Sequence, residues 1–302
     1  MPSQSPHPVK VFDRNRINNL RERSAANLDK HDFLFEWVAS NLDGRLADIT
    51  RQFPTALMIG GRLNKDHKTL LIEQAKIKQL ITMELGAKLL KGKHELNVQA
   101  DEEMLPFGEN TLDMVISPLS LHSVNDLPGT LIQINHALKP DGLFLAALFG
   151  GKTLFELREC MMQAEIITTG GVSPRIFPFA DKQQLGSLMQ RAGFALPVID
   201  SEHITVSYPN LKKLLHDLRG MGEGNAIIER SRRPATKALF EKTEQEYLKR
   251  FSDEQGKIQA SFEIIFLTGW APHSAQQQPL RPGSAENALA SALDTEEISV
   301  KR

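Results

Sequence analysis

Glycine and acidic side chains follow the ends of predicted buried strands, and these residue types together can bind a nucleotide. Gly60 and Gly61 come directly after the strand expected at 56–59. Glycine there lets the main chain approach a ligand closely, and the start of the next helix offers free amide donors. The alternative is an ordinary turn between a strand and a helix, in which a glycine pair is common.

An acid ends the second predicted strand, at 79–83. Glu84 lies near the roughly 20-residue spacing that separates a nucleotide loop from the carboxylate that accepts the ribose hydroxyls. The alternative is a solvated acid at a helix N-terminus, where the helix dipole favours negative charge. The sequence leaves both interpretations open.

The segment after the third predicted strand, at 96–99, holds the remaining candidate cofactor-binding residues. Asp101 could accept a hydrogen bond from the exocyclic amine of adenine, with Glu102 beside it and Met104 against the ring. The alternative for Asp101 is to cap a short helix. His122 is the candidate catalytic residue, because it is the one titratable side chain expected at the mouth of this pocket. A satisfied structural histidine is the more common role for such a residue.

Basic residues gather at two places before the second strand. The first group lies in the N-terminal helical segment and consists of Arg14, Arg16, Arg21 and Arg23. The second group follows the glycine pair and consists of Arg62, Lys65, His67 and Lys68. We expect both groups to face solvent, as most charge clusters do. A phosphate-bearing ligand at the second group is the alternative.

Short apolar runs alternate with helical stretches along the chain. The predicted strands are 56–59, 79–83, 96–99, 112–117, 143–149, 194–207 and 258–270, and the predicted helices between the first six are 64–77, 85–91, 126–138 and 153–168. Helical patterns also cover 11–48 and 208–250, the second with a break at Gly220–Gly224. Strands that alternate with helices pair in parallel, because a crossover must return the chain to the same edge. The two late strands suit an antiparallel edge, so the fold class is α/β.

Composition limits the classes of function. The 302 residues carry 36 basic and 37 acidic side chains, a formal net charge of −1, so no net charge recruits nucleic acid or an anionic membrane. No apolar run approaches the roughly 20 residues of a transmembrane segment, and the first residues lack the apolar core of a secretory signal. The single Cys160 cannot form an internal disulfide or a thiolate metal site, and no metal site is expected. We expect a soluble protein of the bacterial cytoplasm, or of the mitochondrial matrix in a eukaryote.

Several motifs give the chain a recognisable resemblance. They are VFDRNR at 11–16, LSLHSVNDLP at 119–128, GGVSPRIFPF at 170–179 and DLRGMGEGN at 217–225. With these motifs the chain resembles class I S-adenosylmethionine-dependent methyltransferases over residues 11–270. It is most similar to the subfamily of the mitochondrial complex I assembly-factor 5 protein and its alphaproteobacterial relatives. A more distant similarity is to the malonyl-carrier-protein methyltransferase of biotin synthesis.

The resemblance implies a three-layer Rossmann-like fold with a mostly parallel seven-stranded sheet whose last strand is antiparallel. It also implies helical lid segments over the site and S-adenosylmethionine as cofactor. The domains expected on this basis are a disordered N-terminus at 1–10, a helical lid at 11–52, a methyltransferase-like domain at 53–270 with a helical insertion at about 208–250, and a disordered tail at 271–302.

The cofactor loop departs from the family pattern Asp-Leu-Gly-Cys-Gly-x-Gly. Met58 stands in place of the aspartate, and Arg62 and Asn64 stand in place of two glycines. A side chain where only main chain should approach the ligand creates a clash or forces the loop to move. Ser123 stands where relatives often have tryptophan, which predicts a less enclosed pocket. The altered loop therefore argues against the cofactor that the rest of the resemblance implies.

The resemblance leaves three functions open, because a fold alone does not select a chemistry. The first is a methyltransferase that acts on a protein side chain or a carrier-bound acid, with a respiratory complex I subunit as a candidate substrate. The second is a non-catalytic binding protein in complex I assembly. The third is a relative of an arginine hydroxylase.

Overall fold

The computed structural model describes residues 10–90 and 96–277. Its centre is a seven-stranded sheet in the order β3-β2-β1-β4-β5-β7-β6. The strands are β1 (Thr55–Ile59), β2 (Gln79–Glu84), β3 (Leu96–Gln99), β4 (Leu112–Pro118), β5 (Leu138–Phe149), β6 (Ala195–Tyr208) and β7 (Ile258–Trp270). Strands β1 to β5 pair in parallel, and β7 is antiparallel to both β5 and β6. The predicted α/β fold, with a mostly parallel sheet and an antiparallel last strand, is confirmed.

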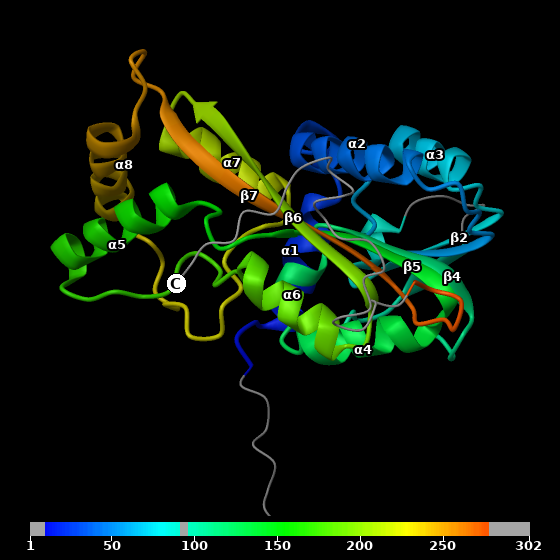
Figure 1. Cartoon of the computed structure of the whole chain (residues 1–302). Coiled ribbons are helices and arrows are strands. Elements are labelled where there is room, and N and C mark those ends of the chain that lie inside the picture. The colour runs from blue at the N-terminus through cyan, green and yellow to red at the C-terminus, as the bar shows by residue number, and fades with distance from the viewer. Residues whose placement is uncertain (1–9, 91–95, 278–302) are drawn as a thin grey trace, which may run out of the picture. The chain divides into compact units, whose positions relative to one another are not determined.

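The strand order reverses between β1 and β4, which places a binding crevice at the carboxyl ends of these strands. Helices cover both faces of the sheet, with α2 and α3 on one face and α4 and α6 on the other (Figure 1). The α-helices are α1 (Arg14–Ser24), α2 (Phe33–Ala47), α3 (Lys65–Gln74), α4 (Leu127–Ala137), α5 (Phe155–Thr169), α6 (Lys182–Arg191), α7 (Leu211–Gly220) and α8 (Lys237–Phe251). Short 3₁₀ turns are η1 (Leu28–Lys30), η2 (Ala87–Leu89) and η3 (Leu121–Ser123).

Strand β1 shows how the sheet separates two apolar cores. Ala56 and Met58 belong to the core beneath α2 and α3, whereas Leu57 and Ile59 belong to the core beneath α4 and α6. Successive side chains of a strand point to opposite faces, so a strand covered on both sides is apolar throughout. Met58 is therefore an ordinary core residue.

The structure corrects two predictions of helical structure and adds one helix that was not predicted. Of the helix predicted at 85–91, the described residues 85–90 form only the 3₁₀ turn η2, and the amides of Leu85 and Gly86 bond the carboxylate of Glu84. Residues 225–236 are not helical, since Ile227 pairs with Phe12 across an isolated bridge. Helix α6 was not predicted, although its N-terminus carries a capping box of Asp181 and Gln184.

Part of the predicted domain division falls outside the described residues. The disordered segments expected at 1–10 and 271–302 lie there for the most part, so these predictions remain untested. Among the described residues, 10–90 and 96–272 belong to one compact unit and 273–277 to a second. Within the described ranges, no helix has the length and apolar character needed to cross a membrane.

Candidate functional site

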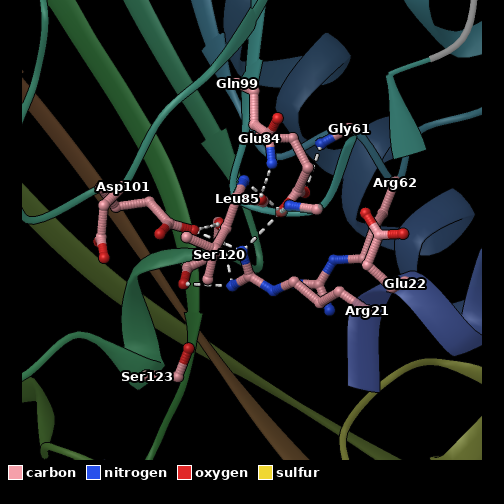
Figure 2. A network of polar contacts seen from close by, with 12 residues as sticks. Arg21, Glu22, Gly61, Arg62, Glu84, Leu85, Gln99, Asp101, Ser120 and Ser123 are labelled. Atoms are coloured by element: carbon pink, nitrogen blue, oxygen red, sulfur yellow. Dashed lines mark hydrogen bonds and ion pairs between the residues drawn. The ribbon is translucent and has the colours of Figure 1, made fainter. Parts of the chain in front are cut away.

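Glu84 ends β2 with a fully buried carboxylate under the loop that follows β1. Its Oε2 accepts a hydrogen bond from the Gly61 amide at 2.9 Å, and its Oε1 accepts one from the Leu85 amide at 2.8 Å. Glu84 is therefore not a solvated acid. It holds the glycine loop against the end of the second strand (Figure 2).

A second buried carboxylate lies beside the first. Glu102 follows β3, is fully buried, and accepts a hydrogen bond from the Ser120 hydroxyl at 2.9 Å through Oε1. Two carboxylates in one buried site repel each other unless a cation lies between them. The site therefore requires a positive partner.

Arg21 of α1 supplies that cation. Its Nη1 lies 2.8 Å from Glu84 Oε1 and 2.5 Å from Glu102 Oε1, and only 2% of its surface is exposed. Its Nη2 lies 3.4 Å from both the carbonyl and the hydroxyl oxygen of Ser120. Figure 2 shows Arg21 reaching from α1 toward Glu84. The space between the strand ends is thus filled by a side chain of the protein itself.

Arg14 lies about two helical turns before Arg21, on the same face of α1. Its Nη2 lies 2.7 Å from Asp101 Oδ1, and the guanidinium also bonds Glu102 and the carbonyl oxygen of Ser123. The prediction that this arginine group faces solvent is wrong for Arg14 and Arg21, because buried acids attract them. Arg23 is exposed as expected. Ser123 is buried, and the less enclosed pocket expected in comparison with relatives stays a prediction.

The arginine contacts make the acid site sensitive to low pH. Burial alone would raise the pKa of Glu102, but Arg21 and Arg14 outweigh it and lower that pKa from 4.5 to about 2. A lowered pKa stabilises the fold above pH 4.5, and the contribution disappears as the pH falls toward 2. We therefore expect the free energy of unfolding to fall steeply across this interval, as followed by circular dichroism. Glu102→Gln should flatten that part of the profile, whereas Glu109→Gln, at an exposed position, should leave it unchanged.

The two glycines pack against the protein rather than beside an open space. A Cβ on Gly60 would lie 3.2 Å from Ser120 Cβ, and one on Gly61 would lie 2.9 Å from the Leu89 carbonyl oxygen. Gly60 also has a φ of +111°, which favours glycine. Both residues are therefore needed for the closed loop seen here.

Arg62 points inward, so the prediction that it faces solvent is wrong. Only 2% of its surface is exposed. Its Nη1 lies 2.5 Å from Glu223 Oε1, its Nη2 bonds the Leu119 carbonyl oxygen, and its guanidinium stacks 4.6 Å from the ring centre of Phe35. Lys68 is also buried, against the same prediction. Arg62 ties the loop after β1 to the segment after α7.

His122 lies beside this ion pair. Its Nε2 is 3.1 Å from Glu223 Oε2, and its ring packs 4.8 Å from the ring of Phe149 and 5.9 Å from that of Phe179. Burial lowers the pKa of His122 below its ordinary value, and Glu223 only partly offsets the effect. His122 and Glu223 therefore form a buried pair at the carboxyl end of the sheet.

A cavity of about 360 Å³ lies at the start of α3 and is lined by Arg62, Lys65 and Lys68. Asp29 and Asp32 line it as well, so the carboxylates oppose the basic residues. The pKa of Asp32 is raised by burial and by the neighbouring Glu36. This balance of charge does not favour the phosphate-bearing ligand considered for the basic group.

The structure brings most of the predicted cofactor-binding residues together. Gly60, Gly61, Glu84 and Glu102 form one cluster. Asp101 joins it through Arg14 and also caps a turn by accepting from the Glu103 amide at 2.9 Å. Met104 lies apart, with 76% of its surface exposed.

Sequence reasoning missed three residues that complete the two clusters. Ser120 and Glu223 lie inside motifs that the sequence analysis noted without assigning them a role, and Arg21 was expected in solvent. The signals that could have found them are the helical spacing of Arg14 and Arg21 and a lone acid within a glycine-rich break. Neither signal identifies a partner by itself.

Comparisons with known proteins agree with the fold. A family model described as a methyltransferase domain matches residues 66–146. The chain is 39% identical to the protein of Mus musculus named arginine-hydroxylase NDUFAF5, mitochondrial, over 94% of this chain and 84% of that protein. It is 30% identical to the malonyl-[acyl-carrier protein] O-methyltransferase of Gallionella capsiferriformans, over 87% and 92%.

A solved structure with the same fold is the phosphoethanolamine N-methyltransferase 2 of Haemonchus contortus in complex with S-adenosyl-L-methionine. The TM-score is 0.50 at 14% identity, and the match covers 85% of this chain and 60% of that one. At this identity the likeness concerns the arrangement of strands and helices, and it agrees with the sheet described above.

Proposed function

The chain belongs to the family of the mitochondrial NDUFAF5 proteins, and on that premise we propose that it is an enzyme that uses S-adenosylmethionine and modifies a protein side chain during assembly of respiratory complex I. Its location would be the bacterial cytoplasm or the mitochondrial matrix. The relatives' name makes arginine the side chain to consider first, and hydroxylation an alternative to methyl transfer. The observation that carries the proposal is the position of Glu84. It is buried at the end of β2 and hydrogen bonded to the loop after β1.

The types of residue at the strand ends fit an adenosyl group, but the space between them does not in this conformation. Glu84 and the glycine pair Gly60–Gly61 are the residue types that hold such a ligand in this class of fold, but the Gly60 amide donates to the Met83 carbonyl oxygen and the Gly61 amide to Glu84. Arg21, however, lies between Glu84 and Glu102, and the faces of both glycines are covered. Binding therefore requires α1 to withdraw Arg21 from the acids.

The filled site also favours a second candidate function. A non-catalytic member of the family would keep the fold as a binding surface and would use Arg21 as a permanent part of its core. The ion pairs of Arg21 with two fully buried acids support this candidate, because such contacts stabilise a closed site. The two candidates differ in whether Arg21 can be displaced.

Titration calorimetry of the full chain with S-adenosylhomocysteine tests the proposal. We expect measurable heat for the wild type and an affinity roughly 10- to 100-fold lower for Glu84→Gln, because a charged hydrogen-bond acceptor is lost. Glu109→Gln, at an exposed position, is the control. Absence of heat for both the wild type and Arg21→Ala would remove the enzyme proposal and leave the binding protein.

A further inference from the structure

His122 and Glu223 have a geometry that the proposed function does not yet use. Glu223 Oε2 lies 3.1 Å from His122 Nε2, while His122 Nδ1 is buried and has no hydrogen-bond partner among the described residues. A carboxylate can only accept a hydrogen bond, so it selects the tautomer with hydrogen on Nε2. The lone pair is then on Nδ1.

An unpartnered buried nitrogen is uncommon in native proteins and is unfavourable for folding. Nδ1 of His122 is such a nitrogen, in a side chain that is only 2% exposed. The ring is held by Phe149 and Phe179 and by Glu223, so it cannot turn without losing all three contacts. The protein thus fixes a neutral imidazole with one unused acceptor.

Two cavities lie beside the contacts of His122, although His122 itself lines neither of them. A small cavity of about 40 Å³ is bordered by Glu223, Phe149 and Phe179. A cleft of about 530 Å³ is adjacent to it, because the two share Arg175, Ile176, Phe177 and Phe179 as lining residues. The size of the cleft is within the range of ligand sites in proteins.

We infer that His122 is the general base of the site, that Glu223 is its positioning residue, and that the substrate group is an N–H or O–H that enters through this cleft. The N–H or O–H bond breaks, its electron pair stays on the nitrogen or oxygen, and the proton moves to Nδ1. The resulting imidazolium is paired with Glu223. A carboxylate acceptor would need no such base, so the inference selects among the substrates of the proposed function, on which it rests.

The charged groups around His122 come from three elements and together set its protonation. Glu223 in the segment after α7 favours the imidazolium, whereas Arg62 after β1 and Arg21 of α1 oppose it. Burial, the largest effect, lowers the pKa of His122. A neutral base near pH 7 is the result, and protonation at lower pH should remove its function.

Two measurements on the full chain test the inference without a cofactor. Long-range ¹H–¹⁵N NMR should show the hydrogen of neutral His122 on Nε2 in the wild type and a mixture of tautomers in Glu223→Gln. Diethyl pyrocarbonate, which acylates neutral imidazole, should modify His122 at least about tenfold faster than His31, because a residue without access reacts only after local opening. His31 is a matched control, since it is buried and paired with Asp217 at 2.9 Å.

Hydrogen on Nδ1 of the wild-type ring, or acylation no faster than that of His31, would overturn the inference. If Glu223→Gln does not fold because Arg62 loses its carboxylate, Arg62→Leu combined with Glu223→Gln removes both charges and gives the same comparison of tautomers. Neither measurement depends on S-adenosylhomocysteine. Failure here is therefore distinct from failure of the calorimetric test.

Discussion

Replacement of Arg21 with alanine is expected to lower the free energy of unfolding by about 3–5 kcal/mol. The change leaves Glu84 and Glu102 fully buried without the guanidinium that lies 2.8 and 2.5 Å from them. Two like charges then face each other in a medium of low polarity, and one must take up a proton or reach water. Urea unfolding at pH 7, followed by fluorescence, measures the loss.

Arg23→Ala is the matched control, because Arg23 belongs to the same helix and is exposed. Its replacement should change the free energy of unfolding by no more than about 0.5 kcal/mol, as is usual for surface positions. Equal changes for the two variants would contradict this prediction. The buried ion pairs would then have no net effect on stability.

The same variant separates the two candidate functions. If Arg21 competes with an adenosyl ligand, S-adenosylhomocysteine should raise the melting temperature of Arg21→Ala more than that of the wild type. A ligand at 100 times its dissociation constant adds about 2.7 kcal/mol to the stability of a folded state that binds it. If Arg21 is instead a permanent part of the core, S-adenosylhomocysteine should not shift the melting temperature of the wild type or of Arg21→Ala.

The strands could be predicted because burial on both faces of the sheet requires apolar residues at successive positions. A strand covered on both faces has no polar side to alternate, and β1 and β4 are accordingly almost continuous apolar runs. The residues that end such runs must lie at the same edge of a parallel sheet. The clustering of Gly60 and Glu84 therefore followed from pattern alone.

The role of Arg21 could not be predicted in the same way. Its partners Glu84 and Glu102 are 63 and 81 residues away in the chain. Within the helix, closely spaced arginines have the composition of a solvated face, and burial of arginine is rare unless acids compensate it. Only the folded structure shows that α1 lies over the ends of β2 and β3.

The role of Glu223 could not be predicted either, because its glycine-rich sequence indicates a break in a helix and gives no sign of a functional site. It lies between Gly222 and Gly224, and its partners His122 and Arg62 are 101 and 161 residues away. The glycine-rich turn after α7 brings it to the carboxyl end of the sheet. Contacts of this range leave no periodic signal in one sequence.

The ion pair of Arg62 and Glu223 gives the second large prediction. Arg62→Leu and Glu223→Gln should each lower the free energy of unfolding by about 3–5 kcal/mol, since each leaves a largely buried charge without its partner. The double variant should lose less than the sum of the single losses by at least about 1 kcal/mol, because it removes both charges together. A double-mutant cycle by urea unfolding measures this coupling.

The ion pair of Lys237 and Glu241 on α8 provides the matched cycle. It joins exposed side chains one helical turn apart, so Lys237→Gln and Glu241→Gln should couple by only about 0.3–0.5 kcal/mol. In Arg62→Leu the pKa of His122 should also rise, because the cation that opposes the imidazolium is gone. If the losses of unfolding free energy are additive and the pKa of His122 does not change, Arg62 only fills space and has no electrostatic coupling to Glu223 or His122. Strong coupling would mean that Arg62 stabilises the contact between the loop after β1 and Glu223, the residue that positions His122.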